Sequence, residues 1–132
     1  MRYLLDTNVI SAFIRNPSSP VLDRIEAVGT SEVCTSVIVA AELRFGAARQ
    51  QNSSLVERVE AALGRLNVVP WDYPADVEYA RIRAMLEASG TPIGSNDLLI
   101  AAQTLALELT LVTDNEREFR RVEGLDVENW LR

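Results

Sequence analysis

The sequence predicts an α/β fold in which a central parallel sheet of four to five strands is covered by helices on both faces. Short apolar runs alternate along the chain with longer segments that repeat apolar residues at helical spacing. This strand-then-helix order occurs four times, and it is typical of parallel sheets, whose strands are joined by helical crossovers. With 132 residues, 48% of them hydrophobic and 24% charged, the chain is expected to form a single domain over residues 1–132.

Each element of this fold is predicted from its own residues. Strands are expected at 2–5, 32–35, 67–70, 110–113 and, at the end of the chain, 127–130. Helices are expected at 8–15, 18–28, 37–50, 55–66, 75–88 and 95–109, with another beginning near Glu116. Pro20 suits the first turn of its helix, and Gly90 suits the residue that closes the helix over 75–88.

Two absent residue types restrict the chemistry open to the chain. It has no histidine, and all 13 of its basic residues are arginines, so it has no lysine either. The first absence excludes imidazole acid–base pairs, Ser-His-Asp triads and HExxH zinc sites. The second excludes a P-loop ATPase and Schiff-base chemistry. Any enzyme chemistry must therefore use carboxylates, hydroxyls, arginines or a bound metal ion.

Charge and targeting signals restrict the partners. A formal net charge of −6 counts against nucleic acid only weakly, because arginine grips phosphates through a planar fork and carboxylates that hold metal ions are neutralised. Asp6 interrupts the apolar N-terminal run too early for a secretory signal, so we expect a cytoplasmic protein that makes no membrane contact. The single cysteine, Cys34, is expected to be a buried, reduced thiol.

Two acidic residues directly follow predicted strands. Asp6 comes after the first strand and Asp114 after the fourth. In parallel sheets ligands bind at the carboxyl ends of the strands, where the strand order reverses. Both residues also have a purely structural interpretation, since Asp6 could cap the next helix and Asp114 could belong to a loop-to-helix turn.

Two further acidic residues lie on helices. Glu42 stands in a helix so apolar that its side chain needs a partner, which could simply be Arg44, Arg49 or another arginine, unless the helix turns Glu42 toward water. Asp97 follows Ser95, a candidate N-cap, and could be explained by the helix dipole alone. Carboxylates brought to one sheet edge would repel one another unless cations neutralised them. With oxygen ligands only, the cation expected is Mg²⁺ or Mn²⁺.

Four motifs now resemble those of a known family. The stretches LLDTNVIS, AELRFGA, PIGSNDLLIAA and LVTDNEREF, in that order, closely resemble PIN-domain ribonucleases of the VapC toxin family. The resemblance runs from the first residues to the terminal VENW and so covers essentially the whole chain. It implies a three-layer α/β/α sandwich and a Mg²⁺- or Mn²⁺-dependent endoribonuclease.

The resemblance also implies a set of site residues. The catalytic and metal-binding carboxylates map onto Asp6, Glu42 and Asp97, and Asp114 is favoured over Asn115 for the fourth position. Groups that orient the carboxylates or metal-bound water map onto Thr7, Asn8, Ser95, Thr113 and Asn115.

Partners follow from the same resemblance. Family members are paired with an antitoxin that blocks the site, form homodimers and larger assemblies with the antitoxin, and cut loops of transfer or ribosomal RNA. Arg15, Arg44 and Arg49 lie near the motifs and are candidates for RNA contact. The expected products carry a 5′-phosphate and a 3′-hydroxyl, because a metal-bound water is the nucleophile.

Two other functions compete with this one. An aspartyl-phosphate phosphatase would also begin with an Asp at the end of the first strand, but it needs a second Asp where Asn8 stands, and a lysine. A non-catalytic interaction module would use the carboxylates only as caps and ion pairs.

Overall fold

A computed structural model describes all residues, 1–132, and contains five strands and seven α-helices. The strands are β1 (Tyr3–Leu5), β2 (Val33–Ser36), β3 (Asn67–Val69), β4 (Thr110–Val112) and β5 (Val127–Glu128). The helices are α1 (Thr7–Arg15), α2 (Pro20–Val28), α3 (Val37–Gln50), α4 (Ser53–Gly64), α5 (Ala75–Ala88), α6 (Ser95–Ala106) and α7 (Glu116–Phe119), with a 3₁₀ turn, η1 (Thr30–Glu32), before β2. Every predicted element is present.

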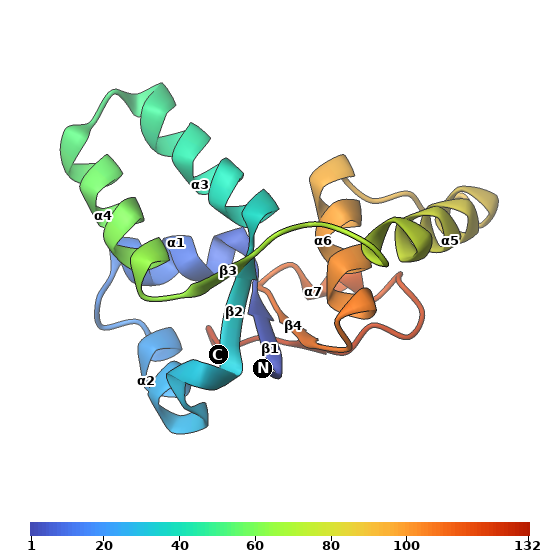
Figure 1. Cartoon of the computed structure of the whole chain (residues 1–132), viewed down its shortest axis with the longest axis horizontal. Helices are drawn as coiled ribbons and strands as arrows, with labels where there is room; N and C mark the ends of the chain where they lie inside the picture. Colours follow the sequence, from blue (N-terminus) through green and yellow to red (C-terminus); the bar gives the residue numbers. More distant parts are fainter.

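The five strands form one parallel sheet in the order β3-β2-β1-β4-β5. In Figure 1, helices α1 to α4 lie on one side of this sheet and α5 to α7 on the other. The predicted α/β class and three-layer arrangement are confirmed. Successive strands first run from β1 toward β3 and then continue on the other side of β1 with β4, so the strand order reverses between β1 and β4. Ligands gather at such a position.

Local capping explains where several helices begin. Asp6 caps α1 by accepting from the Thr7 N–H, and the hydroxyls of Ser19 and Ser36 cap α2 and α3. Asn52 caps α4, which therefore starts two residues earlier than predicted. The predicted N-cap of α6 is wrong: Gly94 holds that position and Ser95 is the first helical residue.

Helix α6 also ends earlier than predicted. It stops at Ala106 because Glu108 adopts a left-handed backbone, with φ of 55°, and the chain turns there into β4. At the end of α5, Gly90 with φ of 68° closes the helix as predicted. The first turn leads the chain into β4, and the second leads it from α5 into α6.

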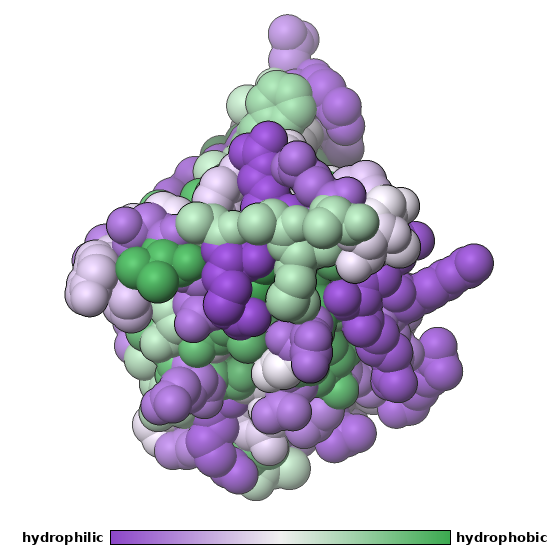
Figure 2. All heavy atoms as spheres, turned by 90° about the vertical axis from the view of Figure 1, so that its right-hand side faces the viewer, coloured by the Kyte–Doolittle hydropathy of each residue, from purple (hydrophilic) through white to green (hydrophobic).

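One core fills the space between the sheet and its helices. Its largest fully buried side chains include Trp130, Phe119 and Leu4, and the Trp130 ring meets Tyr3 edge-on at 5.0 Å between centroids. Cys34 is buried as expected, and burial raises the pKa of its thiol to about 11. On the α5 side, hydrophobic atoms reach the surface in patches among hydrophilic ones (Figure 2). None of the helices has the length and apolar character needed to cross a membrane.

Two side chains fasten the segment after β3 to α6. The indole N–H of Trp71 donates to the Leu99 carbonyl at 2.8 Å, and the Gln103 amide donates to the Pro70 carbonyl at 3.0 Å. The position of α6 matters because its first turn lies at the carboxyl edge of the sheet.

Candidate metal and catalytic site

Asp6 lies at the carboxyl end of β1, at the reversal point, and only 3% of its surface is exposed. Its Oδ1 accepts from the Thr7 N–H at 2.8 Å, and its Oδ2 accepts from the Thr113 hydroxyl at 2.8 Å. Burial raises the pKa of Asp6, the charges of Glu42 and Glu118 raise it further, and the two hydrogen bonds oppose this. A helix cap alone would not require a carboxylate so deeply buried.

Glu42 is positioned by a hydroxyl from the neighbouring helix. The Thr7 Oγ1 of α1 donates to Glu42 Oε1 of α3 at 2.7 Å. The alternative of an ion pair with Arg44 is wrong, because that guanidinium pairs with Glu60 on α4 at 2.9 Å. Arg49 instead lies over the Phe45 ring at 5.5 Å. Glu42 therefore has no basic partner in the structure.

Asp97 projects from the first turn of α6, where it is partly buried. Burial together with the negative charges of Asp6, Glu118 and Glu42 raises the pKa of Asp97 to about 7. Residues as far apart in sequence as Asp6 and Glu118 thus share one electrostatic environment, as the sheet topology predicts.

Glu118, on α7, is a member of this cluster that the sequence analysis missed. Its carboxylate accepts from the Gly94 N–H at 2.7 Å and from the Asn115 amide at 2.6 Å. Burial would raise the pKa of Glu118, but hydrogen bonds from Gly94, Asn115 and Asp97 outweigh it and lower the pKa. The available signal was its place in a short helix directly after β4, at the same edge as Asp6.

Gly94 allows Asp97 and Glu118 to approach each other. A Cβ at this position would lie 3.3 Å from Asp97 Oδ2 and 3.8 Å from Glu118 Oε1. A side chain there would therefore crowd the Asp97 carboxylate and make an ordinary contact with that of Glu118. The requirement for glycine at this position of the PIGSND motif is therefore steric, and it comes from the carboxylate cluster itself.

Thr113 connects most of the residues expected to orient the site. It is fully buried, and besides donating to Asp6 its Oγ1 accepts from the Asn115 N–H at 3.0 Å. The Asn8 amide approaches Thr113 Oγ1 at 3.4 Å and Asp6 Oδ2 at 3.5 Å. Thr7, Asn8, Thr113 and Asn115 therefore contact the cluster, whereas Ser95 is exposed at the start of α6.

Asp114 is placed differently from the other predicted carboxylates. It is exposed, and its Oδ1 accepts from the Asn129 amide at 3.0 Å. Only its backbone touches the site, through an N–H that donates to Asn8 Oδ1 at 3.0 Å. The side chain of its rival, Asn115, reaches the cluster by donating to Glu118. The structure thus brings Asp6, Glu42 and Asp97 together and leaves the Asp114 carboxylate outside.

The chemistry of the cluster fits a hard divalent cation. None of the six ion pairs of the protein includes any of its four carboxylates, and the one basic side chain whose charge favours the cluster is Arg121, which acts on Glu118. All candidate donors are oxygens, which Mg²⁺ and Mn²⁺ prefer. As the side chains stand, no three acidic, histidine or cysteine groups are arranged to hold one ion. Binding would therefore require the carboxylate side chains to rearrange.

Comparison with known proteins adds independent findings. Residues 3–125 match the PIN domain family. The chain is 36% identical to the tRNA(fMet)-specific endonuclease VapC of Salmonella typhimurium, covering 98% of each chain. It is 35% identical to Ribonuclease VapC2 of Rickettsia felis, again covering 98% of each.

Solved structures agree in fold. The structure of VapBC2 from Rickettsia felis, bound to a DNA fragment from its promoter, matches with a TM-score of 0.92 at 32% identity, covering 98% of this chain and 99% of that chain. DNA-bound VapBC from Salmonella typhimurium matches with a TM-score of 0.88 at 35% identity, covering 98% of both chains.

Proposed function

Because this chain belongs to the PIN-domain family and has VapC ribonucleases as full-length relatives, we propose that it is the toxin of a toxin–antitoxin pair and cleaves RNA with a divalent cation. The observation that carries the proposal is the cluster of carboxylates at the reversal point of the sheet. Carboxylates held this close together reduce the stability of the fold. A divalent cation would offset their repulsion and would also bind the phosphate of a substrate.

In this proposal Asp6, Glu42 and Asp97 hold Mg²⁺ or Mn²⁺, with Glu118 beside them. When bound, the ion supplies an activated water and a site for phosphate oxygens. Thr113 and Thr7 hold the carboxylates of Asp6 and Glu42 in place through their hydroxyls. Asp114 stays a prediction from the sequence for the fourth position, and its carboxylate would have to leave Asn129 to serve there.

The relatives also suggest partners. The two solved structures described above are VapBC complexes, and the relative from Salmonella typhimurium is named as specific for tRNA(fMet). We extend both features to this chain: an antitoxin that covers the site, and structured RNA such as tRNA as the substrate. A homodimer, and a larger assembly with the antitoxin, stay predictions.

The test is an RNA cleavage assay with the purified, antitoxin-free protein. Total cellular RNA is incubated with Mg²⁺ or Mn²⁺, with excess chelator, and with the Asp6→Asn variant, and the cut ends are mapped. We expect cleavage that leaves 5′-phosphate ends only in the metal-loaded wild type. Full cleavage in chelator would exclude the metal. Hydrolysis of phosphomonoesters instead of RNA would favour the phosphatase, and neither activity would favour an interaction module.

A further inference from the structure

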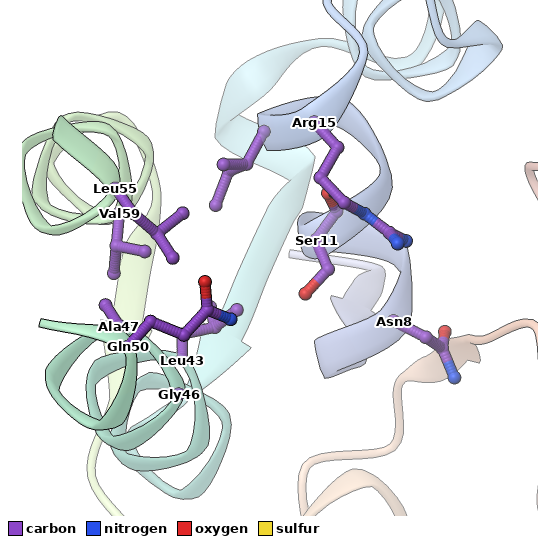
Figure 3. A pocket seen from close by; sticks show the side chains of 10 residues that line it. Asn8, Ser11, Arg15, Leu43, Gly46, Ala47, Gln50, Leu55 and Val59 are labelled. Carbon is purple, nitrogen blue, oxygen red and sulfur yellow. The ribbon is translucent and has the colours of Figure 1, made fainter. Parts of the chain in front are cut away.

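A groove opens beside the acidic cluster, between α1, α3 and α4. We call it the α1–α3–α4 groove; it has a volume of about 380 Å³, within the range of sites that hold small ligands. Its polar lining comes from Asn8, Ser11 and Arg15 of α1 and Gln50 of α3, and apolar side chains such as Leu43 form the walls. In Figure 3 the Ser11 and Gln50 side chains point into the hollow between α1 and α3, and the polar ends of Arg15 and Asn8 lie along α1 beyond it in this view.

The groove is continuous with the proposed catalytic site through Asn8. The amide of this residue approaches Asp6 and Thr113, while the same side chain lines the groove. A chain bound in the groove would therefore run directly to the acidic cluster.

The charge of the groove is opposite to that of the rest of the protein. Arg15 is its only charged lining residue, in a chain with a formal net charge of −6. Its guanidinium forms no ion pair and donates only to the Ser11 carbonyl, from Nε at 3.3 Å. In Figure 3 the Arg15 side chain runs along α1 toward Asn8. A free cation at this place, beside acidic groups, suits a phosphate of a bound polymer.

The remaining lining suits a nucleoside. The Ser11 hydroxyl and the Gln50 amide face each other across the hollow in Figure 3. Single-stranded RNA is recognised by hydrogen bonds to base edges and 2′-hydroxyls and by contact with base faces. Polar groups on two sides and apolar walls between them provide both kinds of contact.

Gly46 forms part of the groove lining from the middle of α3. A Cβ there would meet no atom within 4 Å, so packing does not require glycine. Glycine inside a helix is less stable than alanine, because its backbone loses more conformational freedom on folding. Its benefit here is space, because a larger side chain would fill the hollow.

From these observations we propose that the α1–α3–α4 groove binds a nucleotide of the RNA substrate next to the scissile phosphate, with Arg15 on a phosphate and Gly46 keeping the groove open. The proposal rests on the ribonuclease function proposed above and names where its substrate lies. The other two arginines that were candidates for RNA contact already have partners. Arg44 forms an ion pair with Glu60, and Arg49 lies over the ring of Phe45.

The test compares two groove variants with two matched controls. Gly46→Leu fills the groove, and Arg15→Gln removes its cation. Gly64→Leu and Arg65→Gln make the same changes at exposed positions before the amino end of β3, the opposite edge of the sheet from Asp6. Binding to a fluorescent 20-nucleotide single-stranded RNA of random sequence is measured by anisotropy over a salt series, and cleavage of total RNA is measured in parallel.

We expect both groove variants to bind the RNA about tenfold more weakly, the loss of roughly one base contact, and both controls to bind like the wild type. Arg15→Gln should also reduce the slope of log affinity against log salt by about 0.7, the value for one phosphate contact on a single strand. If Gly46→Leu unfolds, the exposed Arg15→Gln still decides the matter.

Unchanged RNA affinity and salt slope in Arg15→Gln would overturn the proposal and leave the groove to a protein partner. The ribonuclease function is judged separately by wild-type cleavage in the same experiment, so a protein that binds RNA through the groove but never cuts it would refute that function alone.

Discussion

On the β1 side of the cluster, both carboxylate oxygens of Asp6 accept hydrogen bonds from neutral donors. On the α6 side, Asp97 lies beside another carboxylate, that of Glu118. The first arrangement fixes one carboxylate at the sheet edge whether or not an ion is present. In the second, burial together with the charges of Asp6 and Glu118 raises the pKa of Asp97 to about 7. A cation would therefore stabilise the α6 side most, because it would relieve repulsion between carboxylates there. The β1 side provides one carboxylate, Asp6, whose position is already fixed before the cation binds.

The largest effect is expected from Asp6→Asn. Asparagine still offers an oxygen to the Thr7 N–H and so preserves the cap of α1, but it removes the central negative charge. Loss of a metal-based contribution of several kcal/mol should lower kcat on the order of a thousandfold. Cleavage assays check this, with circular dichroism to verify the fold. Retained activity in a folded variant would show that the β1 side is only structural.

Asp97→Asn should abolish cleavage to a similar degree and also change how stability depends on pH. The folded-state pKa of Asp97, about 7, is above the ordinary 3.8, so its contribution to stability is complete below pH 3.8 and is lost as pH rises through 7. Glu118, with its lowered pKa, acts in the opposite sense below about pH 4.5.

Metal-free wild type should therefore melt at progressively lower temperature between pH 5 and pH 7.5, whereas Asp97→Asn should melt at a nearly constant temperature across that range. Differential scanning calorimetry in chelator measures both proteins. Parallel curves would mean that the α6 side carries no unusual repulsion.

Thr7→Val tests whether the hydroxyl positions Glu42. Valine keeps the shape but cannot donate to Glu42 Oε1, so affinity for Mn²⁺ should fall about 10- to 100-fold. Thr7→Ser restores the donor and should recover most of it. Isothermal titration calorimetry measures the Mn²⁺ affinity of both variants. If Thr7 acted only through packing, Thr7→Ser would bind Mn²⁺ more weakly than Thr7→Val.

The smallest effects separate two candidates for the fourth carboxylate. Glu118→Gln should reduce cleavage about tenfold, because the residue borders Asp97, while Asp114→Asn should change it by less than about threefold, because its carboxylate lies on Asn129. Cleavage rates of the two variants at one Mn²⁺ concentration decide the order. The reverse order would restore the position favoured from the sequence.

The fold was predictable because its signals are local and repeated. Alternating strands and helices imply a parallel sheet, and the strand ends then bring Asp6 to the same edge as the residues after β4. The family motifs supplied Glu42 and Asp97, whose structural alternatives were about equally reasonable from the sequence alone. The boundaries of α4 and α6 were not predictable to the residue, since they depend on the Asn52 cap and the backbone of Glu108.

The directions of the side chains at the carboxyl edge of the sheet were harder to predict than the fold. Asp114 and Asn115 are adjacent, and only the tertiary contacts with Asn129 and Glu118 turn one away from the cluster and the other toward it. Glu118 joins the cluster through the N–H of Gly94, which lies 24 residues earlier in the sequence. Contacts of this kind have no periodic pattern that a sequence could reveal.

The most direct test of the account is whether Mn²⁺ stabilises the protein through the cluster. Melting temperature is followed at pH 7.5 as Mn²⁺ is added to the wild type, Asp6→Asn and Asp97→Asn. An ion that binds only the folded protein raises the melting temperature with concentration, so the wild type should rise steadily while both variants stay nearly unchanged. Equal rises in all three proteins would contradict the account, because the ion would then be bound somewhere else.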